Sequence, residues 1–163
     1  MIIRDANIND AESIVYINVM GWKHTYKDIF PKEYLDKLDP SNDESIEKCK
    51  NSINQYAVCE LEGEIVGMVR YGKNKKKYDD EYGEIYALYV KSGMHKKGVG
   101  TQLIRYAFEK LKNYFDFCVI STLEANSANA FYSKTGGKRI GKSTFILDNK
   151  TYTENVYKYI LNE

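Results

Sequence analysis

Hydrophobic and polar positions follow two different periods along this chain. Apolar runs rich in β-branched and aromatic residues predict strands at 1–4, 56–60, 64–71, 84–90 and 117–122. Leu61-Glu62-Gly63 lies between the second and third of these runs and predicts a hairpin turn. A last hairpin is expected from 138–147 and 152–161, around Asp148-Asn149.

Helical spacing separates these strands. Ile14, Val15, Ile17 and Val19 give the first helix an apolar side, and Asn9 or Asp10 is expected to cap it, with Glu12 completing a capping box. Residues 21–26 break that pattern, so the helix is expected to end before them. Further helices are predicted at 32–38, 41–53, 101–112 and 126–135. This order predicts a mixed α/β protein with helices on both faces of one sheet.

The stretch 84–103 joins a strand to a helix through a basic, glycine-bearing loop, 95–100. The first N–H groups of a helix lack intrahelical partners, and the helix dipole adds partial positive charge there. Glycine removes the Cβ that would keep a diphosphate away from the backbone. Lys96 and Lys97 add positive charge. The stretch therefore predicts a phosphate-binding site.

Two common phosphate loops do not fit this stretch. A P-loop requires a lysine after its last glycine, and Thr101 follows Gly100. A dinucleotide fingerprint requires a third small residue where Leu103 stands. A nucleotide-binding protein that uses the same loop therefore remains a weaker alternative, one that predicts ATP or NAD binding without coenzyme A.

Length and composition exclude several classes. The 163 residues predict one domain, 1–163, and 43% hydrophobic with 29% charged residues is typical of a soluble globular protein. A net charge of +1 favours neither nucleic acid nor a membrane as partner. Cys49, Cys59 and Cys118 form no C-x-x-C pair, which indicates a reducing cytoplasm and no metal site. No signal peptide is expected in the opening residues.

Three motifs resemble the GNAT superfamily of N-acetyltransferases. His95-Lys96-Lys97-Gly98-Val99-Gly100 is similar to its acetyl-CoA motif Q/R-x-x-G-x-G/A, although His95 replaces the usual Gln or Arg. Asn126 to Tyr132, followed by Gly136-Gly137, resembles its Asn-x-x-x-x-Phe-Tyr-x-x-x-Gly signature. The segment from Trp22 to Pro31 is similar to W-x-x-x-Y-x-x-x-x-P in a bacterial branch. The resemblance covers most of the chain and implies a mostly antiparallel mixed sheet.

The resemblance also implies a cofactor site for acetyl-CoA and no metal. Pantetheine would bond the strand backbone at Leu88, Tyr89 and Val90, the diphosphate would lie on the loop and first helical turn, and Asn126 would bond the pantetheine arm. In this family the acetyl group passes directly to a bound amine. The residues implied in cofactor binding are Leu88, Tyr89, Val90, His95, Lys96, Lys97, Gly98, Val99, Gly100, Thr101, Asn126 and Tyr132.

Two residues are candidates for proton transfer. Tyr132 matches the family's proton donor to the departing thiolate, and the alternative is a packing role beside Phe131. Glu84 is the candidate base, acting directly or through water, and the alternative is a solvated carboxylate at the strand end. Asn126 equally suits a helix cap.

The acceptor is expected to be a primary amine, either a small amine, a polyamine, an amino acid or a peptide. Its pocket is expected to include Trp22, Tyr26, Tyr86 and Tyr152. The acidic residues 79–81 are consistent with polyamine attraction and equally with a solvated loop. Two other functions remain open: a non-catalytic acyl-CoA sensor and a protein N-terminal acetyltransferase. The tyrosine-rich segment 152–159 is consistent with a homodimer surface or with a core strand.

Overall fold

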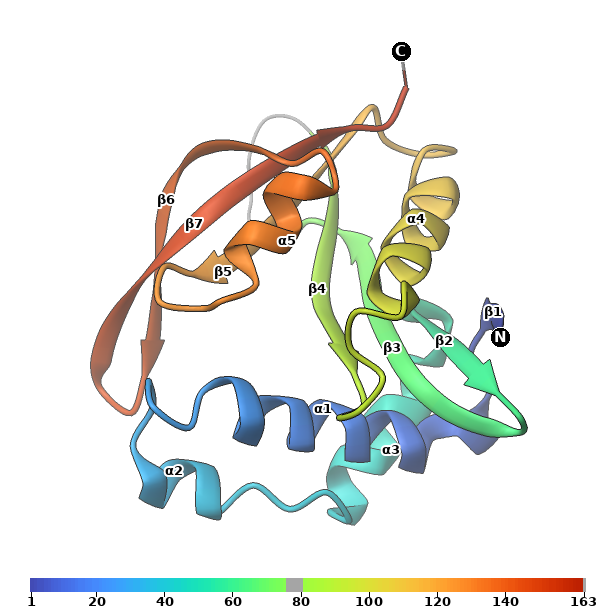
Figure 1. The fold of residues 1–163 in the computed structure, drawn as a ribbon, viewed down its shortest axis with the longest axis vertical. Helices are drawn as coiled ribbons and strands as arrows, with labels where there is room; N and C mark the ends of the chain where they lie inside the picture. Colours follow the sequence, from blue (N-terminus) through green and yellow to red (C-terminus); the bar gives the residue numbers. More distant parts are fainter. Residues whose placement is uncertain (76–80, 163) are drawn as a thin grey trace. The chain divides into compact units, whose positions relative to one another are not determined.

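The computed structural model describes residues 1–75 and 81–162. In these ranges seven strands hydrogen-bond in one sheet, in the order β1-β2-β3-β4-β5-β7-β6 (Figure 1). The strands are β1 (Ile2–Asp5), β2 (Tyr56–Leu61), β3 (Glu64–Lys73), β4 (Gly83–Val90), β5 (Phe117–Leu123), β6 (Lys138–Leu147) and β7 (Lys150–Ile160). The α-helices are α1 (Ala11–Thr25), α2 (Lys32–Asp36), α3 (Asp43–Asn51), α4 (Val99–Leu111) and α5 (Asn129–Lys134).

The predicted fold class is confirmed. β1 with β2, β2 with β3, β5 with β7 and β6 with β7 pair antiparallel, whereas β4 and β5 pair parallel. By contacts the chain forms two compact units, of which the first comprises Met1–Tyr71 and Ala87–Ala107 and the second Gly72–Tyr86 and Phe108–Glu163. No helix in the described ranges is both long and apolar enough to cross a membrane.

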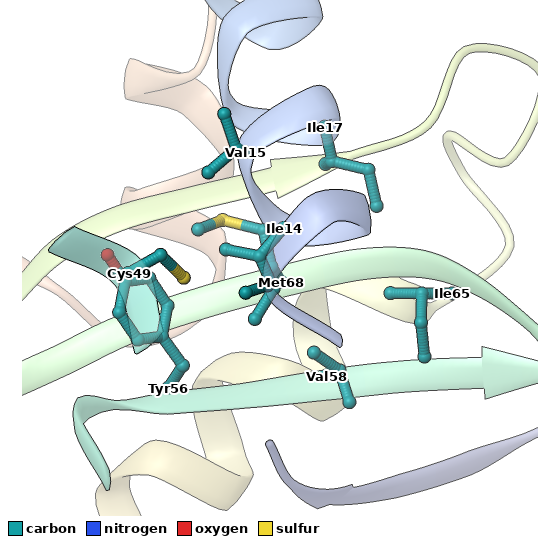
Figure 2. Close-up of a cluster of buried hydrophobic side chains, with 9 residues drawn as sticks. Ile14, Val15, Ile17, Cys49, Tyr56, Val58, Ile65 and Met68 are labelled. Atoms are coloured by element: carbon teal, nitrogen blue, oxygen red, sulfur yellow. The ribbon is translucent and has the colours of Figure 1, made fainter. Parts of the chain in front are cut away.

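The core of the first unit lies between α1, α3 and the strands β2 and β3 (Figure 2). Ile14 of α1 and Met68 of β3 are 2% and 1% exposed, so helix and sheet meet without water between them. Ala87 and Tyr89 of β4 pack against the same cluster. The apolar stripe on α1 therefore buries itself as its spacing predicts. The members of the cluster are Ala11, Ile14, Val15, Ile17, Cys49, Tyr56, Val58, Ile65 and Met68.

The prediction that α1 ends before residue 21 was wrong. α1 runs through Gly21 and Trp22 to Thr25. Glycine inside a helix usually lowers stability, but here the ring of Tyr89 lies directly against Gly21, so packing compensates for the weak propensity. Asp10, one of the two predicted caps, does hold the cap position of α1, but its side chain makes no capping bond there. That side chain instead completes a capping box with Asn7 around the short 3₁₀ turn Ile8–Asp10.

The remaining elements differ from prediction mainly at their ends. α2 ends at Asp36, α3 begins at Asp43 with Asn42 as its cap, and α4 begins two residues early, at Val99. α5 begins only at Asn129, because the side chain of Asn126 bonds Ala128 N–H in a preceding turn. Residues 76–80 lie outside the described residues, and with them Asp79 and Asp80 of the acidic group 79–81.

The second unit is built on the long β5–β7–β6 ladder. Cys118 and Ile120 of β5 are buried, and β7 pairs with β5 from Phe117↔Ile160 to Leu123↔Glu154. The turn between β6 and β7 places Asp148 and Asn149 at φ of 52° and 60°. Aspartate and asparagine tolerate this left-handed region better than most residues, so the predicted hairpin turn is confirmed.

A partly buried group of charges joins the beginning of the chain to β2. Arg4 donates from Nη1 and Nη2 to the two carboxylate oxygens of Asp10, at 2.7 and 3.0 Å, and from Nε to Glu60 at 2.9 Å. Asp10 is 7% exposed and also accepts from Asn7 N–H at 2.8 Å. Hydrogen bonding from Arg4 holds the pKa of Asp10 below its ordinary value. Asp10 therefore stabilises the fold only while it is ionised.

We expect Asp10→Asn to lower the free energy of unfolding by about 2 kcal/mol at pH 7, because bonds to charged groups contribute roughly 1.5–3 kcal/mol. The pKa of Asp10 is depressed in the folded protein. Its contribution to stability is therefore fully present above its unfolded pKa of about 4, and it disappears as the pH falls through the lower folded pKa. Urea unfolding of both proteins from pH 7 to pH 2.5 measures this. The two proteins should converge at the acid end.

Asp36→Asn is the matched control, because Asp36 pairs with Lys32 on the exposed surface of α2. Exposed pairs of this kind contribute little, so this variant should unfold like the wild type throughout. A constant difference between wild type and Asp10→Asn at every pH would contradict the role assigned to the Asp10 carboxylate.

Candidate active site

The segment predicted to bind phosphate, 95–100, forms the turn between β4 and α4. Lys96 and Gly98 have φ of 62° and 82°, and the amide of Gln102 donates to the carbonyl of Gly98 at 3.0 Å, which begins the helix. Gly98 is therefore required by its backbone conformation. Val99 is only 1% exposed and anchors the first turn of α4 in the core.

Polar groups on this turn are exposed, whereas its apolar residues are buried. The side chains of His95, Lys96 and Lys97 are exposed, and the imidazole Nε2 of His95 lies 3.0 Å from the carbonyl oxygen of Val90. Gly100 and Thr101 are half-buried in the first helical turn. Exposed lysines beside the N-terminus of a thirteen-residue helix favour an anion such as diphosphate.

The last residues of β4, Leu88, Tyr89 and Val90, are half-buried. The ring of Tyr89 packs on Gly21 of α1, and its hydroxyl lies 3.4 Å from that of Tyr26. Around Tyr26 the rings of Trp22 and Phe30 lie with centroids at 5.0 and 4.7 Å. The structure thus brings Trp22 and Tyr26, predicted to line the acceptor pocket, together with the end of β4.

The first half of β4 belongs to the second unit. Glu84 accepts a hydrogen bond from the side-chain amide of Asn74 at 2.9 Å. The hydroxyl of Tyr86 donates to the carbonyl of Lys73. Glu84 is therefore a bonded, half-buried carboxylate and not a freely solvated strand end. The parallel pairing of β4 with β5 covers Gly83↔Cys118, Glu84↔Val119 and Ile85↔Ile120, and β4 continues beyond it to Val90.

Asn126 lies in the turn between β5 and α5. Its amide donates to the hydroxyl of Thr122 at 3.0 Å, and its carbonyl oxygen accepts from Ala128 N–H at 2.9 Å. The side chain is 8% exposed. This turn-forming role resembles the expected capping role, although the cap position of α5 itself is Ala128.

Tyr132 is 8% exposed on α5, and its backbone is held from three directions. The carbonyl of Tyr132 accepts from the hydroxyl of Tyr159 at 2.8 Å, from Gly137 N–H at 3.0 Å and from the hydroxyl of Thr135 at 3.2 Å. Burial raises the pKa of Tyr159 to about 12, so Tyr159 remains a neutral donor. α5 is therefore fixed at its C-terminal end.

Asn129 fixes the other end of α5. Its side-chain amide donates to the carbonyls of Leu123 and Asn126 at 3.0 and 2.6 Å. Its oxygen accepts from Asn155 at 2.9 Å and from the hydroxyl of Tyr157 at 2.8 Å, both on β7. These bonds connect the β5–α5 turn to β7 and so set the position of the helix that carries Tyr132.

Tyr152 lies on β7 in register with Phe145 of β6 and is half-buried. It is placed in the second unit with Glu84, Tyr86, Asn126 and Tyr132, whereas Trp22, Tyr26, Leu88–Val90 and residues 95–101 belong to the first. Within the first unit a hollow of about 450 Å³ lies elsewhere, lined by Tyr16, Asp43 and Glu64 among others, and by none of the candidate site residues.

The cysteines are buried, and burial raises the pKa of Cys49, Cys59 and Cys118. A buried thiol with a raised pKa is a poor nucleophile, because the thiolate is the reactive form. In residues 1–75 and 81–162, no group of three or more His, Cys, Asp or Glu side chains could hold a metal ion.

Four residues that shape these surroundings were not predicted from the sequence: Gly21, Gly67, Asn129 and Tyr159. Gly21 was interpreted as a helix breaker, Tyr159 gave no signal beyond its strand, and Gly67 was read only as part of a strand. Asn129 belongs to the resembling motif, but its contacts with β7 join residues far apart in the chain. Only the isolated glycine inside a strand pattern is a general sign of close backbone approach, and it applies to Gly67.

Comparison with known proteins identifies the family of this chain. The family model described as Acetyltransferase (GNAT) family matches residues 19–137. That range includes the glycine-bearing turn 95–100, α4 and Tyr132. An uncharacterized N-acetyltransferase of Bacillus subtilis (strain 168), YuaI, is 24% identical over 144 residues, which cover 88% of this chain and 83% of the relative.

Solved structures share the fold. PaiA N-acetyltransferase from Thermoplasma acidophilum, in complex with coenzyme A, superimposes with a TM-score of 0.75 at 23% identity, covering 97% of this chain and 98% of the other. YncA from Salmonella typhimurium, a putative acetyltransferase with its cofactor acetyl-CoA, gives 0.77 at 18% identity, covering 100% and 95%. Ribosomal-protein-alanine N-acetyltransferase from Brucella melitensis gives 0.75 at 20% identity, covering 98% and 99%.

Since the family model matches residues 19–137, more than half of the chain, this protein belongs to the GNAT family and is an acetyl-CoA-dependent N-acetyltransferase.

Proposed function

We propose that the protein transfers the acetyl group of acetyl-CoA directly to a primary amine while both substrates are bound, and that the two units form one catalytic domain. The observation that carries the direct mechanism is the burial of all three cysteines with raised pKa values. An acyl-enzyme on cysteine requires an accessible thiolate. Attack by the amine on the bound thioester requires no nucleophile from the protein.

The cofactor would be held by backbone groups. The diphosphate would lie on the N–H groups of Lys97 to Thr101, where Gly98 has φ of 82° and leaves the turn without a Cβ. His95, Lys96 and Val99 flank these amides. Pantetheine would bond the backbone at Leu88 and Val90, on the part of β4 that continues beyond its pairing with β5. Asn126 would bond the pantetheine arm.

Proton transfer would complete the reaction. An amide N–H near Tyr89 or Val90 would polarise the thioester carbonyl as an oxyanion-hole donor. Tyr132 would protonate the departing thiolate of coenzyme A. For an ordinary phenol and thiol this transfer is uphill by about 1.5 pKa units, or roughly 2 kcal/mol, which a transition state accommodates.

Glu84 would accept the proton from the amine, directly or through one water. Its carboxylate is already oriented by the amide of Asn74 at 2.9 Å, which suits a positioned base better than a mobile surface group. An amine with a pKa near about 10 is partly neutral at pH 8, so the base assists and is not indispensable.

The acceptor pocket would be aromatic and would include Trp22, Tyr26, Tyr86 and Tyr152. Rings at 5.0 Å spacing around Tyr26 suit an amine that carries either a cationic or an apolar portion, since aromatic faces attract both. Small amines, polyamines, amino acids and peptides meet this description. The structural likeness to a ribosomal-protein-alanine N-acetyltransferase supports a protein N-terminus as the alternative acceptor. Non-catalytic acyl-CoA sensing is the alternative from another class.

For its setting we propose the cytoplasm, in agreement with the three free cysteines. We also propose a homodimer that uses the last strands. β6 is the final strand in the sheet order, and Ile140 and Ile146 on it are 53% and 69% exposed. Exposed apolar residues on an edge strand favour pairing with another chain.

Thermal unfolding and steady-state kinetics test the proposed activity together. Acetyl-CoA at 100 times its dissociation constant should add about 2.7 kcal/mol to the stability of the folded state and raise Tm, whereas ATP and NAD should not. Thiol release on an amine panel should give intersecting double-reciprocal lines. Parallel lines would indicate an acyl-enzyme. Binding without turnover on any amine would favour the sensor.

We expect Tyr132→Phe to lower kcat about 100-fold, because general acid catalysis contributes roughly 10²–10⁴-fold. Affinity for coenzyme A should stay at the wild-type value, since the ring is kept. Tyr114→Phe is the control, because Tyr114 is 81% exposed and outside the site. Isothermal titration and thiol release measure the two quantities. A kcat equal to that of the control would remove Tyr132 from the mechanism.

A further inference from the structure

Gly67 lies in β3 where α4 rests on the sheet. A Cβ atom built on Gly67 would be 2.9 Å from Cγ1 of Val99 and 2.9 Å from Cδ1 of Leu103. Real Cβ atoms essentially never have neighbours closer than 3.0 Å. The same Cβ would be 3.4 Å from the backbone oxygen of Tyr89. Glycine therefore allows the first turn of α4 to approach β3 and β4 more closely than any other residue would.

The crowded side chains cannot yield easily. Val99 and Leu103 are 1% and 0% exposed, so no solvent space is available for another rotamer. A valine in a helix also has one strongly preferred χ1 rotamer. A side chain at position 67 would therefore displace the helix itself, and overpacking of this kind is accommodated by small backbone shifts.

The displaced turn would be the one that starts at the proposed diphosphate site. Val99 follows Gly98 directly, and the first helical hydrogen bond runs from Gln102 N–H to the Gly98 carbonyl. On the other face of β4, the ring of Tyr89 lies against Gly21, where an added Cβ would be 2.7 Å from its Cγ. β4 is thus confined at Tyr89 from the side of α1, and the strain from a residue at 67 falls on α4.

We propose that Gly67 is a positioning residue for the cofactor, because it sets the distance between the first turn of α4 and the strand that carries Tyr89. Gly67 itself does not touch the cofactor. The proposal rests on the proposed placement of the diphosphate on that turn. It assigns Gly67 a role in recognition of the nucleotide end of acetyl-CoA and none in the chemistry at the thioester.

Gly67→Ala tests this role with two acetyl donors. With acetyl-CoA, kcat/KM should fall about tenfold and the Kd for coenzyme A should rise equally, because small misplacements of binding groups far from the chemistry cost one to two orders of magnitude. With S-acetylpantetheine, which carries no diphosphate, kcat/KM should equal that of the wild type. A general loss of structure would lower activity with both donors to the same extent, and that result would overturn the proposal.

Gly141→Ala is the matched control, because Gly141 is exposed on β6 and an added Cβ has nothing within 4 Å. If Gly67→Ala does not fold, the volume-conserving pair Gly67→Ala with Leu103→Val is compared with Leu103→Val alone. The pair should still lose affinity for coenzyme A, because the contact with Val99 remains. Equal affinities would refute the proposal.

The test separates this inference from the proposed function. Absence of coenzyme A binding and turnover in the wild type would end the proposed function. A wild type that uses acetyl-CoA, combined with a Gly67→Ala variant that behaves like Gly141→Ala, would end only the role of Gly67.

Discussion

The close approach of the first turn of α4 to β3 and β4 is the constraint on which the proposed cofactor site depends. A helix N-terminus binds an anion only if its amides stand where the ligand arrives, and their position follows from the packing beneath them. Here the packing is made by Val99 and Leu103, fully buried against a glycine. The exposed lysines of the turn add charge, but the buried residues determine the geometry. If the diphosphate binds where we propose, its recognition begins in the core of the first unit.

In the second unit, Tyr132, the proposed proton donor, is positioned by hydrogen bonds that hold α5. α5 has six residues, too few to be stable by its own hydrogen bonds. Tyr159 and Asn129 compensate by binding its two ends to the rest of the unit. Both carry polar groups into the interior, where an unsatisfied donor or acceptor would cost about 1–3 kcal/mol. The hydrogen bonds of Tyr159 and Asn129 therefore favour one orientation of α5 over others.

The sequence was sufficient for features that depend on neighbouring residues. The strand, turn and helix over β4 and α4, the hairpin turns and the apolar stripe of α1 were all predicted correctly, because periodicity and glycine placement are local signals. The end of α1 was not predicted correctly. The helix continues past Gly21 because the ring of Tyr89, which is distant in sequence, packs on it. Contacts between residues distant in sequence also explain what was missed around the proposed active site. The glycines of the loop were found, whereas Gly67 and Tyr159 act through contacts with residues more than twenty positions away.

The fifteen tyrosines differ in burial and in the hydrogen bonds of their hydroxyl groups. Tyr159 has its pKa raised to about 12, and its hydroxyl is engaged with Thr135 and the carbonyl of Tyr132. Protonation of a thiolate near pKa 8.5 from such a phenol would be uphill by about 3.5 units, or roughly 5 kcal/mol, against roughly 2 kcal/mol for an ordinary phenol. A tyrosine that supports structure is thus a poor acid for the reason that makes it a dependable donor. This is why we propose Tyr132 and not Tyr159 as the proton donor: the hydroxyl of Tyr159 is engaged in holding the backbone of Tyr132.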